Sequence, residues 1–355
     1  MLLSLREAWL TFTRAANFGL LSISHRLKRI EVWGMPEYVM IEPTNACNAR
    51  CPLCPTGAGQ ITRAAKMMEI DIFKRLVDEI FPYVHTLNLW NLGEPFLNRR
   101  SFDMIRYAQE HAIRVKVSTN GWVLYQSENI GQLIDSGLAQ LIVSLDGATA
   151  ETFNQYRVGV DFERVLTGLR LLRDEKTRRQ VTHPVVEWQF IVMRHNEHEI
   201  EEARRLAREA GAIFSVKTVG VPASAPSLFE RFLPSNKELT RYVQKEDGTY
   251  DLTVERKNDC YLLWHSLVVN ADGQVIPCCW DYYDELPLGN VSQQTIRQIW
   301  NGPQMQELRR KILTSRRDLS PCAECTVDAR LALSLTAPRT RLGRLWSRFA
   351  QARKN

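Results

Sequence analysis

The sequence predicts an α/β protein in which a partial, TIM-like barrel of six strand–helix units, a (βα)6 arrangement, precedes a small cysteine-rich domain. Apolar strand-like runs alternate with amphipathic helical patterns through residues 38–218, which is typical of a parallel sheet covered by helices. The eight cysteines fall into two groups, at 47–54 and 260–325, with none between them. Six units are fewer than the eight of a closed barrel, so we expect the barrel to be incomplete.

The expected strands are short apolar runs, at 38–44, 86–91, 114–119, 140–146, 185–193 and 213–218. The expected helices carry apolar residues at helical spacing, at 71–80, 101–111, 127–136, 161–173 and 197–210. At the start of the last helix, Asn196 and Glu199 have the spacing of a capping box. One more helix is expected around 295–300.

These patterns divide the chain into five parts. They are an N-terminal amphipathic extension, the barrel, a linker and substrate-side region, the cysteine-rich domain and a basic tail, at 1–34, 35–218, 219–259, 260–328 and 329–355. In the extension, Arg6, Glu7 and Arg14 interrupt the apolar run too early for a transmembrane helix or a signal peptide. We expect the extension to form an amphipathic helix that packs on the protein rather than on a membrane.

The net charge of +6 is concentrated at the two ends of the chain. Residues 1–31 carry five basic and two acidic side chains, and residues 329–355 carry seven basic and no acidic ones. Leu342, Leu345 and Trp346 lie among the arginines of the tail, which gives a basic amphipathic pattern. Such a tail suits contact with a membrane surface, a nucleic acid or an acidic partner, or it stays solvated. We expect no specific nucleic acid partner.

Three cysteines lie in the loop after the first strand. Cys47, Cys51 and Cys54 have the spacing Cys-x3-Cys-x2-Cys. A structural zinc site uses four protein ligands, so three thiolates leave one metal position open to a ligand from outside the protein. Short loop spacings of this kind hold iron–sulfur clusters. The loop therefore predicts a 4Fe–4S cluster with one open iron.

Each of the next strands ends in a polar cluster, and in barrels of this kind the working residues sit at the carboxyl ends of the strands. These clusters are Gly93-Glu94-Pro95, Asn120-Gly121, and Ser144 with Asp146-Gly147. Taken singly, each has a structural alternative. The Asn-Gly and Asp-Gly pairs suit simple turns, and Glu94 suits a solvated carboxylate.

The cysteine spacing together with these clusters resembles the radical S-adenosylmethionine (radical SAM) enzymes. The resemblance implies that the open iron binds the amino and carboxylate groups of SAM, and that Glu94 contacts the amino group. It further implies contacts of the SAM ribose or methionyl part with Asn120, Ser144 and Asp146. It implies that Arg157 pairs with the SAM carboxylate, unless it is a surface arginine, and that Val192 contacts adenine. Where many members have a further glycine, this chain has Asn91 and Leu92.

The second cysteine group resembles the SPASM extension carried by a large radical SAM subgroup. Four cysteines, together with Gly273 and a helix near 295–300, carry the resemblance: Cys260, Cys278, Cys322 and Cys325. The full SPASM pattern binds two auxiliary clusters, but no cysteine follows Cys325. The resemblance therefore implies one auxiliary 4Fe–4S cluster, the second cluster of the chain. Zinc is the chemical alternative, since four thiolates suit it equally well.

Cys279 directly follows Cys278. Adjacent residues of a strand point to opposite faces, so we do not expect both to bind the same cluster. Cys279 is then a buried structural thiol, an alternative ligand, or a catalytic hydrogen-atom donor such as some sugar epimerases of the superfamily use.

The resemblance implies an oxidoreductase that takes an electron from flavodoxin or ferredoxin, cleaves SAM to a 5′-deoxyadenosyl radical and abstracts hydrogen from a substrate. We expect a small metabolite such as a sugar or aminocyclitol, because about 35 residues precede the first strand, too few for a separate peptide-binding domain. A peptide- or protein-modifying maturase is one alternative. Outside the enzymes, the alternative is a metal-stabilised protein that binds nucleic acid or a membrane. Reduced thiols and iron–sulfur chemistry indicate the cytoplasm.

Overall fold

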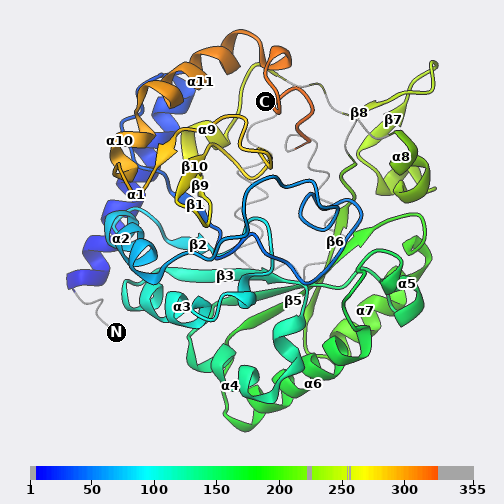
Figure 1. Cartoon of the computed structure of the whole chain (residues 1–355). Helices are drawn as coiled ribbons and strands as arrows, with labels where there is room; N and C mark the ends of the chain where they lie inside the picture. Colours follow the sequence, from blue (N-terminus) through cyan, green and yellow to red (C-terminus); the bar gives the residue numbers. More distant parts are fainter. Residues whose placement is uncertain (1–4, 222–225, 254, 256, 327–355) are drawn as a thin grey trace.

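The structure is a computed structural model, and it describes residues 5–221, 226–253, 255 and 257–326 (Figure 1). The basic tail predicted at 329–355 lies outside the described residues. The partners expected for this tail therefore stay a prediction.

Six parallel strands form the barrel wall. They pair in chain order, each with the next: β1 (Tyr38–Ile41), β2 (Thr86–Asn88), β3 (Arg114–Thr119), β4 (Gln140–Ser144), β5 (Val185–Val192) and β6 (Ile213–Thr218). The partial barrel predicted from the alternating pattern is confirmed. The first strand stops at Ile41 rather than at residue 44. Pro43 has no backbone N–H for a ladder, and the Thr44 hydroxyl bonds to the Lys66 carbonyl.

The cysteine-rich region continues this sheet. Strand β9 (Ser266–Val269) pairs in parallel with β1, on the side opposite β2. Strands β10 (Gln274–Ile276) and β11 (Gly289–Asn290) follow it with antiparallel pairing, so that nine strands of the described part of the chain form one sheet. All four residues of β9 are buried, so the two cysteine groups are joined through a shared core.

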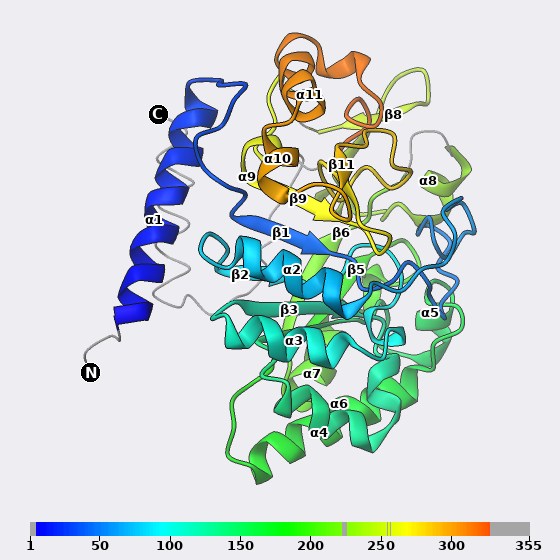
Figure 2. The ribbon, with the colours of Figure 1, turned by 60° about the vertical axis from the view of Figure 1, so that its left-hand side comes forward.

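Helices cover the outer face of the barrel (Figures 1 and 2). Those that follow the strands are α2 (Ile70–Ile80), α3 (Ser101–Glu110), α4 (Ser127–Asp135), α6 (Phe162–Arg178) and α7 (Ile200–Glu209). Successive side chains of a strand accordingly alternate between the helix-covered core and the inner face of the barrel. In β3, Val115 and Val117 are fully buried in the main core, whereas Lys116 and Ser118 on the other face are half-buried. The inner face of the barrel is thus partly polar.

The remaining helices lie at the edges of the barrel. They are α1 (Leu5–Arg26), α5 (Ala150–Asn154), α8 (Pro226–Phe232), α9 (Leu262–His265), α10 (Ile296–Trp300) and α11 (Pro303–Thr314). The N-terminal amphipathic helix expected from the sequence is α1, which buries Leu10 and Leu21 against the protein. The region predicted as a linker contains α8 and a hairpin of β7 (Tyr242–Gln244) and β8 (Tyr250–Leu252).

The capping box predicted at Asn196 and Glu199 is wrong. The Asn196 side chain accepts from the Met193 N–H and donates to the Asp146 carbonyl, while the Glu199 carboxylate accepts from the Ala148 N–H. Because both side chains bond to groups outside the helix, neither caps it. Helix α7 begins at Ile200 after a 3-10 turn. A capping box does form at Thr295 and opens α10.

None of the described helices combines the length and the apolar character that a bilayer-spanning segment requires.

Candidate active site

The loop of Cys47, Cys51 and Cys54 begins directly after β1, at the carboxyl edge of the sheet. It folds tightly on itself, and the Cys54 N–H donates to the Cys51 carbonyl at 3.1 Å. At Gly57, a Cβ atom would lie 2.4 Å from the Cys51 backbone nitrogen, so only glycine fits there. All three thiols are free, and Cys51 is buried. The loop therefore gathers three unpaired thiols at one end of the barrel.

Gly93 brings the next polar cluster against this loop. Its φ is +76°, and a Cβ there would lie 2.2 Å from the Thr44 carbonyl oxygen. The following residue, Glu94, donates its N–H to the Ala46 carbonyl at 2.8 Å. The close approach that glycine permits thus fixes Glu94 beside the first cysteine.

The Glu94 carboxylate is held by neutral donors in a buried position, with 1% of the residue exposed. It accepts from the Thr119 hydroxyl and from the Asn120 N–H, each at 2.8 Å. Burial raises the pKa of Glu94 to about 7, an effect these hydrogen bonds reduce. A carboxylate in such surroundings is favourably placed to receive a cationic group such as an ammonium.

Asn120 links the third strand to the cysteine loop. Its side-chain amide donates to the Asn48 side-chain oxygen at 2.8 Å and lies 3.9 Å from the Cys47 sulfur. Ser144, the last residue of β4, is buried at the same edge of the sheet. The structure therefore brings Asn120 to the cysteine loop, and Ser144 to the end of a strand one place further along the sheet.

Arg157 and Asp146 form a buried ion pair. The Arg157 Nε donates to an Asp146 carboxylate oxygen at 2.6 Å, and the other oxygen accepts from the Ile191 N–H at 2.6 Å. One guanidinium nitrogen of Arg157 then reaches the Cys51 sulfur at 3.8 Å. Arg157 is thus not a surface arginine. The contact of Asp146 with SAM stays a prediction, and in the structure its carboxylate positions Arg157.

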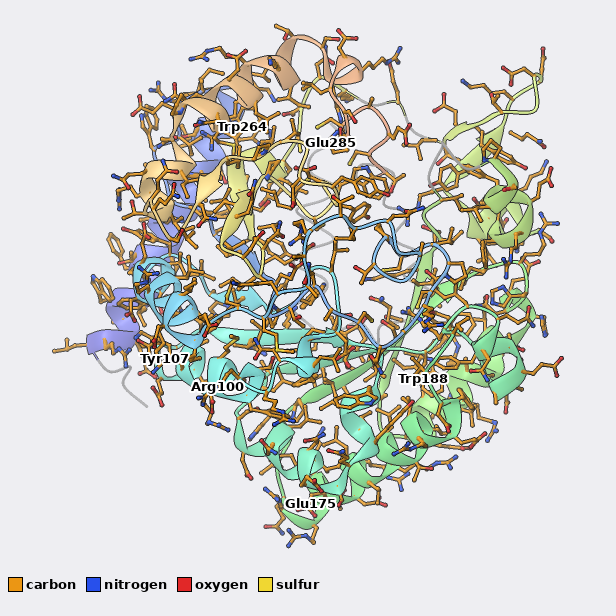
Figure 3. The ribbon with its side chains drawn as sticks, viewed as in Figure 1. Arg100, Tyr107, Glu175, Trp188, Trp264 and Glu285 are labelled. Carbon is orange, nitrogen blue, oxygen red and sulfur yellow. The ribbon has the colours of Figure 1, made fainter. Side chains whose placement is uncertain are left out.

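Buttressing contacts hold the loop that carries Asp146. The Trp188 indole, labelled in Figure 3, donates to the Leu145 carbonyl at 2.8 Å, and Asn196 donates to the carbonyl of Asp146. Trp188 is fully buried, which fixes the indole and with it the end of β4.

Val192 ends β5 with its side chain fully buried in the main core. The preceding residue, Ile191, points to the opposite face of the strand and is half-buried. The adenine contact of Val192 stays a prediction, and because the side chain is buried, such a contact would involve the backbone of Val192.

The four predicted auxiliary ligands surround one cavity. Cys260, Cys278, Cys322 and Cys325 all line it, and so does Arg316. Cys279 is not among the lining residues. It packs instead against the small apolar cluster of Met40, Val268 and Ile276. The two adjacent cysteines thus face different surroundings, although they lie in the turn that follows β10 and not in a strand.

The chemistry of this cavity suits a metal cluster. Burial raises the pKa of Cys260 to about 11 and that of Cys322 to about 12, so thiolates there need a bound cation to stabilise them. The four thiols surround a space. Four thiols around one cavity supply a ligand set that suits an iron–sulfur cluster, with zinc as the chemical alternative.

Sequence reasoning missed a charged network that ties the two cysteine regions together. Arg63 bonds the buried carboxylate of Glu42 at 3.0 Å and that of Asp284 at 2.7 Å. Glu42 also accepts from the N–H groups of Leu92 and Ala271. These partners come from segments far apart in the chain, so no local pattern connects them. The positioning contacts of Thr119 and Asn48 were missed for the same reason.

Comparison with known proteins is consistent with this geometry. Residues 41–207 match the model of the Radical SAM superfamily, and residues 260–326 match that of SPASM, an iron–sulfur cluster-binding domain. One curated relative is the AdoMet-dependent heme synthase of Methanosarcina barkeri. It is 27% identical over 330 residues, which cover 83% of this chain and 90% of the relative.

Two solved structures share the fold at low sequence identity. One is SuiB of Streptococcus suis bound to the precursor peptide SuiA, with a TM-score of 0.61 and 14% identity over 87% of this chain and 73% of SuiB. The other is BtrN in complex with AdoMet and 2-DOIA, with a TM-score of 0.50 and 15% identity over 81% of this chain and 92% of BtrN.

Proposed function

Because the chain belongs to the radical SAM superfamily and carries a SPASM domain, we propose that it abstracts hydrogen from a small-molecule substrate. As an enzyme of this superfamily it uses a 4Fe–4S cluster and SAM, which together supply a 5′-deoxyadenosyl radical when an electron arrives. In our proposal that electron comes from a flavodoxin or ferredoxin. None of the eight cysteines, all of which lie in the described residues, forms a disulfide, which suits a reducing compartment that we take to be the cytoplasm.

The observation that carries the proposal is the meeting of charged groups with the three-cysteine loop. Cys47, Cys51 and Cys54 would hold the cluster. Arg157 lies 3.8 Å from the sulfur of Cys51 and is suited to the SAM carboxylate. Glu94 is buried and accepts from the Thr119 hydroxyl and from the N–H groups of Phe96 and Asn120, all of them neutral donors, so it is suited to the SAM ammonium.

The second cysteine group would hold an auxiliary 4Fe–4S cluster through all four of its ligands. A closed ligand set leaves no position for substrate on that cluster. Its role in this proposal is to pass an electron or to stabilise the region that follows β9.

Cys279 would serve as hydrogen-atom donor in a redox-neutral outcome such as epimerisation. It lies outside the four-cysteine cavity and beside Met40 of β1. The substrate radical would take the hydrogen atom of its thiol, so a C–H bond forms as the S–H bond breaks. One electron and one proton, from the same flavodoxin or ferredoxin and from water, would then restore the thiol.

A polar small molecule is the favoured substrate. The inner face of the barrel carries polar side chains such as Lys116, Ser118 and Gln189, which suit the hydroxyl and amino groups of a sugar or aminocyclitol. A tetrapyrrole is the second candidate, since the heme synthase of Methanosarcina barkeri is similar over most of both chains. A peptide, as in the SuiB complex, is the alternative of another class.

Deuterium transfer tests the proposal. Reduced, anaerobically reconstituted protein is incubated with SAM and, separately, with perdeuterated sugars or aminocyclitols, with deuterated porphyrins and with deuterated peptides. We expect deuterium in 5′-deoxyadenosine only when the deuterated compound is a small molecule. Among the small molecules, a sugar or aminocyclitol is the expected donor. Transfer from a peptide alone would overturn the substrate class, and absence of transfer from every candidate would overturn all of the proposed substrates.

A further inference from the structure

One face of α1 is both apolar and exposed. Its residues recur at intervals of three and four and therefore form one stripe along the helix: Leu5, Trp9, Phe12, Ala16, Leu20, Ile23 and Leu27, the last just beyond the helix end. The exposed fraction is 92% for Leu5, 74% for Phe12 and 60% for Leu27. Over 22 residues, the helix extends about 33 Å. A continuous apolar surface of this length marks an interaction site.

A different face holds α1 on the protein. Leu10 and Leu21 are buried there, and the Asn17 side chain both donates to and accepts from the Met35 backbone. Arg14 donates to the carbonyls of Phe81 and Ala112. Figure 2 shows the helix along the outer side of the molecule, beside β1 and α2. Packing on the protein therefore leaves the stripe uncovered in the described part of the chain.

Charge determines which partner fits the stripe. At 100° per residue, Arg6 lies along one edge of the stripe and Arg26 along the other, and both are exposed. Residues 1–31 carry five basic and two acidic side chains. A second copy of this chain would bring like charges together, and so would residues 329–355, which carry seven basic and no acidic side chains. An anionic surface is the complementary partner.

We propose that α1 binds the surface of a bilayer that contains anionic phospholipids, with its apolar stripe at the acyl boundary and with Arg6 and Arg26 among the headgroups. Trp9, which belongs to the stripe, is about half exposed, and indoles favour this interface. The helix would lie on the membrane without crossing it. The proposal is independent of the reaction that the barrel performs.

Vesicle flotation with the full-length protein tests the proposal. Vesicles of phosphatidylcholine alone are compared with vesicles containing about one third phosphatidylglycerol, at low and high salt. We expect binding to the anionic vesicles, weakened by salt, and an at least tenfold loss of binding in the double variant Phe12→Glu, Ile23→Glu. The matched control is Leu171→Glu, Ile213→Glu, whose residues are 48% and 51% exposed on other elements and should leave binding unchanged.

Three outcomes would overturn the proposal. The first is that wild-type protein does not float with anionic vesicles. The second is that Phe12→Glu, Ile23→Glu binds like wild type while a chain lacking residues 327–355 does not, which would assign binding to the C-terminal segment. The third is that light scattering without lipid shows a dimer that the same double variant dissociates, which would assign the stripe to a second copy. Circular dichroism confirms that each variant is folded.

Discussion

The carboxylate of Asp146, which is shielded from bulk water, positions Arg157. Asp146 is fully buried and receives both the Arg157 Nε and the Ile191 N–H. This arrangement aims the guanidinium at the cysteine loop before any ligand arrives, which lowers the cost of ordering it when SAM binds.

Replacing Asp146 with Asn should therefore weaken SAM binding and stability together. Breaking a buried ion pair costs about 3–5 kcal/mol, because the remaining charge stays buried. We expect the Kd for SAM to rise at least tenfold in calorimetry and the free energy of unfolding to fall in urea titrations. The control is Asp174→Asn, whose carboxylate pairs with Arg173 at the surface and is 62% exposed. Equal effects of the two substitutions would contradict the positioning role.

Glu94 should make the apo protein less stable as pH rises. The folded pKa is raised to about 7 from an ordinary value of 4.5. Between these values the folded state binds a proton that the unfolded state has lost, so the free energy of unfolding falls by roughly 3 kcal/mol across the window. Urea titrations at pH 4.5 and 8 should show this fall in wild type and in Glu201→Gln, whose carboxylate is 83% exposed, but not in Glu94→Gln. The same pH dependence in all three proteins would contradict the assignment.

Arg316 places a buried positive charge at the auxiliary cavity. It is 2% exposed, donates to the Asp259 carbonyl at 3.1 Å and lines the space that the four thiols surround. A cation there favours the more negative, reduced state of a bound cluster. In Arg316→Gln the midpoint potential of that cluster, followed by electron paramagnetic resonance, should fall by about 40 mV, the equivalent of roughly 1 kcal/mol for one electron.

The control for that measurement is Arg310→Gln, which removes an arginine of α11 that is 54% exposed and pairs with Glu307. It should leave the potential unchanged. A cluster that is retained in Arg316→Gln with an unaltered potential would show that the guanidinium serves packing alone.

At the scale of elements, the cysteine loop depends on a glycine in the turn after β2. A Cβ at position 93 would lie 2.2 Å from the Thr44 carbonyl, and the positive φ adds strain for any other residue. Gly93→Ala should therefore displace the loop and lower iron binding at its three cysteines, while the auxiliary site keeps its iron. Iron analysis should then give about half of the wild-type content. Gly220→Ala, with no heavy atom within 4 Å of the added Cβ, is the control. Full iron content in Gly93→Ala would contradict this role.

Several elements follow directly from sequence pattern, and others do not. The runs 114–119 and 213–218 coincide with β3 and β6, because apolar residues that alternate with polar ones, such as Val115 and Val117 of β3, mark a strand with one face in the core. The capping box at Asn196 failed because its spacing is local, whereas Asp146 and Ala148, its actual partners, lie about 50 residues away. Helix α8 was not predicted, because the prolines around it indicate a linker. Its buried Phe229 and Phe232 are nevertheless three residues apart, as in a helix.

At the scale of the whole molecule, β9 joins the two cysteine regions. Its parallel pairing with β1 places the auxiliary cavity and the cysteine loop on one continuous sheet, and Arg63 bridges the two regions through Glu42 and Asp284. The two cysteine groups are readable from spacing in the sequence. How the two groups are joined cannot be predicted from the sequence. Ser266–Val269 has the apolar pattern common to buried strands, and its partner strand lies more than 220 residues away.

SAM cleavage is the sharpest test of whether the loop of Cys47, Cys51 and Cys54 holds the cluster that activates SAM. Anaerobically reconstituted protein is reduced in the presence of SAM, and the 5′-deoxyadenosine formed is quantified. Wild type is compared with the triple variant Cys47→Ala, Cys51→Ala, Cys54→Ala. We expect 5′-deoxyadenosine from wild type and none from the triple variant, which should still bind iron at its auxiliary site. Intact SAM with iron-loaded wild type, or continued cleavage by the triple variant, would contradict it.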